Sequence, residues 1–325
     1  MDRRAFISAV GASIVSAPAV GAAQPVPEIG VLVCGTKRLS LSAERGMGEL
    51  REALRSFGWI DGQGIRITTQ FADLKEERLA SLAQEFVRRK VAIIVYKGTP
   101  PTDAARRATT SIPIVMSGAS DPIAAGFTRN LARPDGNVTG TSLVLTETAG
   151  KRLQFLKEVV PQLTRTAVLH AGGPGQSVLD EVRAAARQLG LDHQEFVYRG
   201  LGSLETQFGG IRAARADSLI VIAAHTIDEA RAPLAQLAMR HRLPTAFTFR
   251  EYIEAGGLLS YGPNLAAVHL HAAYYVDRLL RGAKPADLPI EQPTKFELVI
   301  NAKTAKALGL TIPQSLLVRA DEIIQ

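Results

Sequence analysis

The stretch Gly256-Gly257-Leu258-Leu259-Ser260-Tyr261-Gly262 breaks a regular alternation of short apolar runs and longer amphipathic runs. A second extended segment that ends in glycine, Asn137-Val138-Thr139-Gly140, breaks the same alternation earlier in the chain. Each segment lies where one series of predicted strands and helices gives way to the next, so we interpret both as crossovers between two domains. The sequence therefore predicts two open α/β sheets in tandem and not a single barrel.

Both series repeat a unit in which a β-branched run is followed by a turn and an amphipathic run of about 12 to 16 residues. In the first series, strands are predicted at 29–33, 65–70, 92–96, 112–116 and 138–143, with helices near 42–57, 76–89 and 102–109. In the second, strands are predicted at 166–170, 193–198, 218–223 and 245–249, with helices at 146–159, 177–189, 204–214 and 228–240. Strands that are apolar on both faces need helices on both sides of a parallel sheet. The predicted fold class is α/β, with two doubly wound, Rossmann-like parallel sheets.

The two crossovers also give the domain boundaries. We expect lobe 1 to contain residues 28–142 and 263–285, and lobe 2 to contain residues 143–262 and 290–325. The long helix at 265–281 then returns to the first domain. The tail, with a strand at 296–300 and a helix at 302–308, is expected to cross once more.

Length and composition exclude several classes of protein. At 325 residues the chain exceeds what one hydrophobic core usually organises, so two domains are the default. The hydrophobic fraction of 46% excludes a disordered chain, and a single cysteine excludes a disulfide scaffold. Apolar runs of about 20 residues do not recur, which excludes a polytopic membrane protein.

The net charge of +7 raises the question of nucleic-acid binding. The densest basic groups, Arg88-Arg89-Lys90 and Arg106-Arg107, lie in predicted amphipathic helices and lack interleaved aromatic residues. Solvated helix faces explain them, and no helix-turn-helix pattern precedes the first sheet. We therefore expect no nucleic-acid partner.

The N-terminus resembles an export signal. Paired arginines, Arg3 and Arg4, precede an uncharged stretch rich in small residues that runs from Ala5 to Ala23. The doubled arginine is typical of a twin-arginine signal, although a general secretory signal has a similar pattern. Small residues at the required positions predict cleavage after Ala22 or Ala23, and the mature protein is expected in the periplasm. A retained membrane anchor is the alternative, which Pro18 and the scarcity of leucine disfavour.

Small and hydroxyl-bearing residues follow several predicted strands, at the edge where open parallel sheets bind ligands. In the first domain these turns contain Thr99, Ser117, Ser120 and Asp121, and in the second the glycine-rich turn contains Gly173. Thr99 is expected to cap a helix that starts at Pro100, which directs backbone N–H groups toward an anion. Each turn taken singly is also explained as an ordinary cap, Asp121 above all. Together they predict a site for a small carboxylate between the domains.

Signatures of catalysis are weak. The chain has neither a Gly-x-Gly-x-x-Gly after the first strand, nor a phosphate-binding lysine in the Gly172 turn, nor a Gly-x-Ser-x-Gly elbow. His269 and His271 are two apart on a predicted helix and face different ways, which disfavours joint metal ligation. His170 and His225 end strands and either line the cleft or lie at the surface. Cys34 is interpreted as a buried apolar residue. We expect no enzyme activity, no cofactor and no metal.

Four segments carry a resemblance to a known family: LARPDGNVTG (131–140), REYIEAGGLLSYGP (250–263), PTKFELVIN (293–301) and AKALGLTIP (305–313). They resemble segments of the ABC-transporter substrate-binding proteins whose better-known members bind tryptophan or tyrosine. The resemblance runs through nearly the whole mature chain. It implies the type I periplasmic binding protein fold, with two lobes joined by crossover strands that close on a ligand by hinge bending.

The resemblance also implies where the ligand lies and what the partners are. Ligand contacts are expected at Thr99, Ser117, Ser120, Asp121, Gly173, His225 and Phe249. Members of this fold that bind amino acids place an acidic residue in lobe 2, and the matching positions here hold Thr248, Phe249 and Arg250. An amino acid and an aromatic or aliphatic carboxylate therefore both remain open as ligands. The expected partners are the small molecule and an inner-membrane ABC permease, with the protein itself a monomer.

Two further hypotheses remain. The first is a ligand-sensing periplasmic protein that partners a signalling receptor, which shares the fold with uptake proteins. The second is an exported enzyme or redox protein, because twin-arginine export serves cofactor-loaded proteins. The enzyme requires a nucleotide, flavin or metal signature that the sequence lacks.

Overall fold

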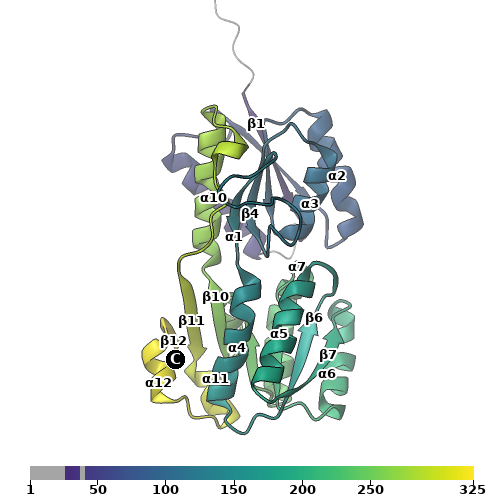
Figure 1. Cartoon of the computed structure of the whole chain (residues 1–325), viewed down its shortest axis with the longest axis vertical. Coiled ribbons are helices and arrows are strands. Elements are labelled where there is room, and N and C mark those ends of the chain that lie inside the picture. The colour runs from purple at the N-terminus through teal and green to yellow at the C-terminus, as the bar shows by residue number, and fades with distance from the viewer. Residues whose placement is uncertain (1–25, 37–40) are drawn as a thin grey trace, which may run out of the picture.

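The computed structural model describes residues 26–36 and 41–325, so the export signal expected at residues 1–23 and its cleavage sites lie outside the described residues. Two lobes stand one above the other, each built on its own sheet (Figure 1). The predicted fold class, with two mostly parallel α/β sheets joined by crossover segments, is confirmed.

Lobe 1 is a five-stranded parallel sheet in the order β2-β1-β3-β4-β5. Its strands are β1 (Glu28–Val33), β2 (Arg66–Phe71), β3 (Ile93–Lys97), β4 (Ile114–Ala119) and β5 (Val138–Ser142). Helices α1 (Leu41–Ser56) and α10 (Leu265–Leu280) cover one face, and α2 (Leu79–Arg88) and α3 (Thr99–Ala108) cover the other. The apolar side chains of each strand alternate between these two layers, because successive residues in a strand point to opposite faces.

Lobe 2 is a seven-stranded sheet in the order β12-β11-β10-β9-β8-β6-β7. Its strands are β6 (Arg165–His170), β7 (Asp192–Val197), β8 (Ser218–Val221), β9 (Thr245–Phe247), β10 (Leu259–Pro263), β11 (Phe296–Asn301) and β12 (Glu322–Ile324). Its helices are α4 (Leu145–Val159), α5 (Gln176–Gln188), α6 (Leu204–Ala213), α7 (His225–Asp228), α8 (Arg231–Arg240), α9 (Arg250–Glu254), α11 (Ala302–Leu308) and α12 (Gln314–Arg319). Against the expected parallel pattern, β11 runs antiparallel to β10, because the chain re-enters this lobe along the neighbouring edge.

The segments interpreted as crossovers are themselves strands of the sheets. Residues 138–140 of the first segment belong to β5 in lobe 1, and residues 259–262 of the second belong to β10 in lobe 2, so the chain changes lobes just after each. Gly140 is required because its φ is +125° and a Cβ would overlap the carbonyl oxygen of Met116 on β4. The helix expected over 228–240 is present as α8 but begins three residues later, at Arg231, because a separate single turn, α7, precedes it.

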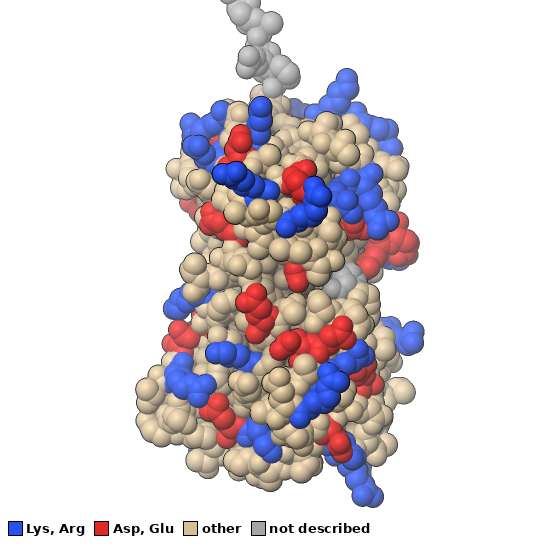
Figure 2. Space-filling view, in the orientation of Figure 1, with Lys and Arg blue, Asp and Glu red and all other residues tan. Residues whose placement is uncertain are grey.

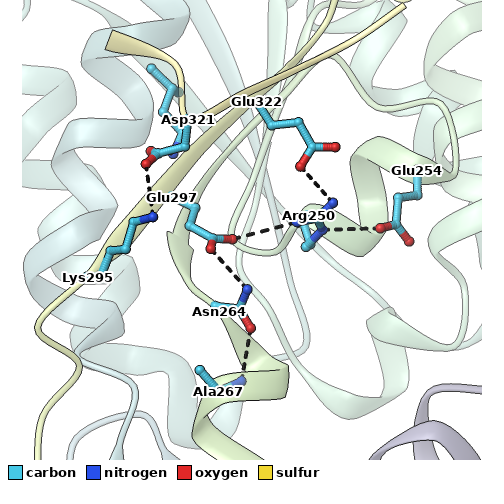
Figure 3. A network of polar contacts seen from close by, with 9 residues as sticks. Arg250, Glu254, Asn264, Ala267, Lys295, Glu297, Asp321 and Glu322 are labelled. Carbon is cyan, nitrogen blue, oxygen red and sulfur yellow. Dashed lines mark hydrogen bonds and ion pairs between the residues drawn. The ribbon is translucent and has the colours of Figure 1, made fainter.

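A polar network holds the crossover region together (Figure 3). Asn264, between β10 and α10, accepts a hydrogen bond from the Ala267 N–H (3.0 Å) and donates one to Glu297 Oε1 on β11 (3.0 Å). Arg250 forms ion pairs with Glu254 (3.2 Å) and Glu322 (2.9 Å). The network thus links the helix that returns to lobe 1 with the strand that returns to lobe 2.

Charged side chains are interspersed over both lobes on the face in Figure 2, and the molecule narrows between them. Acidic and basic groups alternate there and do not form one continuous basic surface. Within residues 26–36 and 41–325, no helix has both the length and the apolar content needed to cross a membrane.

Candidate functional site

A cavity of about 160 Å³ lies between the lobes, at the carboxyl ends of the strands. Lobe 1 contributes the ends of β3 and β4 and the start of α3, and lobe 2 contributes the ends of β6 and β8, the turn after β6, α7, and Phe249 just before α9. This is the edge where open parallel sheets place their ligands, because loops there are free to diverge around a small molecule.

The structure brings six of the seven predicted ligand residues to this cavity: Thr99, Ser117, Ser120, Gly173, His225 and Phe249. Asp121 lies outside it, along an adjoining groove. Its Oδ1 accepts hydrogen bonds from the N–H groups of Ile123 (3.1 Å) and Ala124 (3.0 Å), which is the capping role left open for it. Contact between each of these residues and a ligand stays a prediction.

The start of α3 does not present the row of backbone N–H groups that was expected to bind an anion. Gly98 is the N-cap and the helix begins at Thr99, so Thr99 does not cap it, and Pro100 and Pro101 at the next two positions carry no N–H. Thr99 Oγ1 accepts a hydrogen bond from the Ser120 N–H (3.1 Å), which leaves the hydroxyl proton of Thr99 available to donate into the cavity. The lobe 1 side of the cavity therefore offers side-chain hydroxyl groups to a ligand, and not a row of backbone N–H donors.

Lys97, the last residue of β3, lines the cavity and was not predicted. Its side chain makes no hydrogen bond or ion pair with any residue that the structure describes. Burial lowers the pKa of its ammonium group. The more distant carboxylates of Asp228 and Glu251 act in the opposite direction and raise this pKa. The signal in the sequence is a lysine that ends a fully apolar strand at the ligand edge. Lys97 gives lobe 1 a positive charge that has no contacting counter-ion in the described residues.

His269, on α10, also lines the cavity and was not among the predicted ligand residues. Its Nδ1 shares a hydrogen bond of 2.8 Å with Ser117 Oγ, and only 6% of the residue is exposed. Burial, followed by the charge of Lys97, holds its pKa well below the usual value, so the ring is neutral. Its Nε2 is buried and has no hydrogen-bond partner among the described residues.

Lobe 2 contributes the acidic residue that the sequence around Thr248 did not offer. Asp228, at the end of α7, lines the cavity, and its Oδ1 accepts a hydrogen bond from the Tyr252 hydroxyl (2.7 Å). Burial raises the pKa of Asp228 to about 6. No ion pair within 4.0 Å joins it to Lys97, so the two charges border the same cavity from different lobes without neutralising each other by contact. The acidic residue was missed because the helix predicted over 228–240 placed it at an ordinary helix start.

His225 brings the two lobes into contact. Its ring hydrogen-bonds to the backbone of Lys97 and lies against Gly98. Burial, with the charge of Lys97, lowers its pKa to about 4, so the ring is neutral at physiological pH. The described arrangement is therefore one in which lobe 2 touches lobe 1 across the mouth of the cavity.

Comparison with known proteins places this geometry in a family. The sequence model of the family described as ABC transporter substrate binding protein matches residues 40–324. The tyrosine-binding protein of Clostridioides difficile (strain R20291) is 27% identical over 263 residues, which cover 80% of this chain and 75% of that protein. The ABC domain from Streptococcus pneumonia in complex with L-Trp has a TM-score of 0.83 at 24% identity and covers 92% of this chain and 100% of its own. A conserved domain protein from Vibrio cholerae has the same TM-score and coverage at 23% identity. The family resemblance found in the sequence is confirmed, and the chain belongs to the ABC transporter substrate-binding proteins.

Proposed function

We propose that this substrate-binding protein takes a small dipolar carboxylate, an amino acid or a close analogue, in the cavity between its lobes. The observation that carries the proposal is that Lys97 on lobe 1 and Asp228 on lobe 2 line the same cavity with opposite charges and do not contact each other, with Glu76 as the other acidic residue in the lining. A zwitterion satisfies both, with its carboxylate at Lys97 and its ammonium at Asp228, and each contact is charge-assisted.

The hydroxyl groups fit the same orientation. Thr99 has a proton free to donate, and it lies on the lobe that holds Lys97, so the ligand carboxylate receives its hydrogen bonds from lobe 1. Phe249, on lobe 2, lines the opposite side of the cavity and gives it an apolar wall. The cavity is similar in volume to the engineered cavity of about 150 Å³ that holds benzene, so the ligand is a small molecule.

The names of the relatives support an amino acid. One is called a tyrosine-binding protein and another was solved with L-Trp. Both share less than a third of their residues with this chain, and the side chain of the ligand is a separate question from its dipolar head.

Closure of the lobes is the mechanism in this proposal. The ligand binds to one lobe, the crossover segments bend, and His225 reaches the backbone beside Gly98 as the cleft shuts. The closed monomer then docks on its ABC permease. The export signal predicted for the N-terminus would deliver the protein to the periplasm, where such a permease is reached.

A thermal-shift screen tests the proposal. The purified protein is melted with the standard amino acids, their 2-hydroxy and deamino analogues, and small carboxylates. A ligand present at 100 times its dissociation constant adds about 2.7 kcal/mol of stability, which raises the melting temperature by several degrees. We expect Lys97→Met to abolish the shift and Lys295→Met, at an exposed lysine on lobe 2, to keep it. The proposal fails if no zwitterion shifts the wild type, or if Lys97→Met shifts as much.

A further inference from the structure

A second cavity lies inside lobe 1. It measures about 40 Å³ and sits between the sheet and the helices α1 and α10. Its walls are the apolar side chains of Val31, Val33, Met47, Leu50, Val95 and Ala272. All six are buried members of the same hydrophobic cluster or its immediate lining, and protein cores are normally packed without voids larger than a water molecule. We call this space the lobe 1 chamber.

The chamber adjoins the ligand cavity. Three residues, Lys97, Ser117 and His269, line both spaces and so lie between them, and we call this group of residues the neck. In β3, Val95 and Lys97 point to the same face of the sheet because they are two residues apart. Both line the chamber, and Lys97 lines the ligand cavity as well. The neck is thus polar, whereas the chamber behind it is apolar.

The neck also holds an unsatisfied polar atom. Ser117 Oγ and His269 Nδ1 share a hydrogen bond of 2.8 Å. Nε2 of the same ring is buried and has no hydrogen-bond partner among the described residues. A buried polar atom is normally hydrogen-bonded, and an apolar chamber offers water nothing to bind. A ligand that passes the neck supplies both missing contacts, a polar atom for Nε2 and carbon atoms for the chamber.

We propose that the lobe 1 chamber receives the side chain of the ligand, and that this side chain is a short aliphatic one. The dipolar head stays at the neck, near Lys97 and His269. A volume of 40 Å³ holds roughly three groups the size of a water molecule, so it accepts a chain of about three carbons, whereas the engineered cavity that binds benzene measures about 150 Å³. The inference rests on the proposed function, because it assumes that the head binds in the cleft.

The first experiment measures affinity along a homologous series. The wild-type protein is titrated by calorimetry with glycine, alanine, 2-aminobutyrate, norvaline, norleucine, leucine, phenylalanine and tryptophan. Each CH₂ group buried in the chamber is expected to tighten binding about fourfold up to the three-carbon side chain of norvaline, after which the gain stops. Phenylalanine and tryptophan should bind more weakly than norvaline.

Filling the chamber gives the second experiment. Ala272→Val adds two carbon atoms to its wall and should weaken norvaline binding about tenfold or more while leaving alanine binding unchanged. Val33→Ile reduces the chamber from the opposite side and should act in the same direction, less strongly. Ala53→Val is the matched control, because Ala53 belongs to the same hydrophobic cluster but does not line the chamber. Melting curves check that the filled variants fold, and we expect no loss of stability in Ala272→Val.

The outcomes separate the two proposals. If wild-type protein binds only tryptophan or phenylalanine, or if both filled variants bind norvaline like the wild type, the chamber proposal is overturned and the dipolar cleft stands. If no amino acid of the series binds, the proposed function fails and the chamber proposal fails with it.

Discussion

The imidazole ring of His225, on lobe 2, fills the space beside Gly98 in lobe 1 where any other residue would carry its Cβ. Gly98 has a φ of +89°, so glycine is favoured there by conformation as well as by space. Because the two residues belong to different lobes, opening of the cleft would separate them.

Gly98→Ala should hold the cleft open. The added methyl group overlaps Nε2 of His225, so the lobes cannot reach the described arrangement, and ligand affinity should fall at least tenfold. Small-angle scattering should show wild-type protein contract with ligand while the variant does not. Gly282→Ala is the control, because Gly282 has a similar φ of +95° but open space around its Cβ position. Equal contraction in Gly98→Ala and wild type would remove the proposed role of the contact.

Asp228→Asn should make the protein more stable and a poorer binder. The pKa of Asp228 is raised from 3.8 to about 6, so the folded state holds its proton more tightly than the unfolded state. Stability from this group is therefore present at acidic pH and is lost as the pH rises through about 6. At pH 7.5 the asparagine variant should gain about 1 to 3 kcal/mol by urea denaturation, and this gain should shrink at pH 5. A variant less stable than wild type at pH 7.5 would contradict the cause assigned to the shift.

Binding itself should depend on pH. An ammonium group of the ligand binds the ionised form of Asp228. Because the carboxyl group of Asp228 takes up a proton as the pH drops from 7.5 to 5, ligand affinity should fall about tenfold over this range. Titration calorimetry at several pH values measures this. Asp228→Asn, which does not titrate, should give a weaker but flat profile. A wild-type affinity that is constant across this range would show that Asp228 does not meet a cation.

Asn264 should stabilise the crossover region by two contacts that substitution can separate. Asn264→Ala removes the cap of α10 and the hydrogen bond to Glu297, and should lower the free energy of unfolding by about 1 to 2 kcal/mol. Asn264→Ser keeps a capping oxygen but is too short to reach Glu297, so it should lose less. Urea denaturation measures both, and an equal loss in the two variants would mean that the cap contributes nothing.

The sequence predicts the sheets better than their edges. Runs such as residues 93–96 are apolar on both faces, which identifies buried parallel strands whatever their neighbours are. The short strand β12 and the helix α12 carry no comparable pattern, because β12 lies at an edge and most of its residues are exposed. The antiparallel pairing of β11 depends on where the chain re-enters lobe 2, which periodicity does not encode.

Some residues of the candidate site could likewise be predicted from the sequence, and others could not. Thr99 and Ser117 were found because the ligand edge of a parallel sheet follows from strand order alone. Lys97 was missed because it lies just after the strand predicted at 92–96, and its lack of a contacting acid is visible only in three dimensions. Asp228 and His269 come from elements far from Lys97 in sequence, so only the packing of the lobes reveals that all three border one cavity.

The most direct test of the dipolar cleft is a crystal structure of the protein with the tightest ligand from the thermal-shift screen. It should place the carboxylate within hydrogen-bond distance of Lys97 Nζ and the ammonium within that distance of Asp228, with His225 against Gly98. A ligand bound elsewhere, or one in the cleft whose charged groups touch neither Lys97 nor Asp228, would contradict the account.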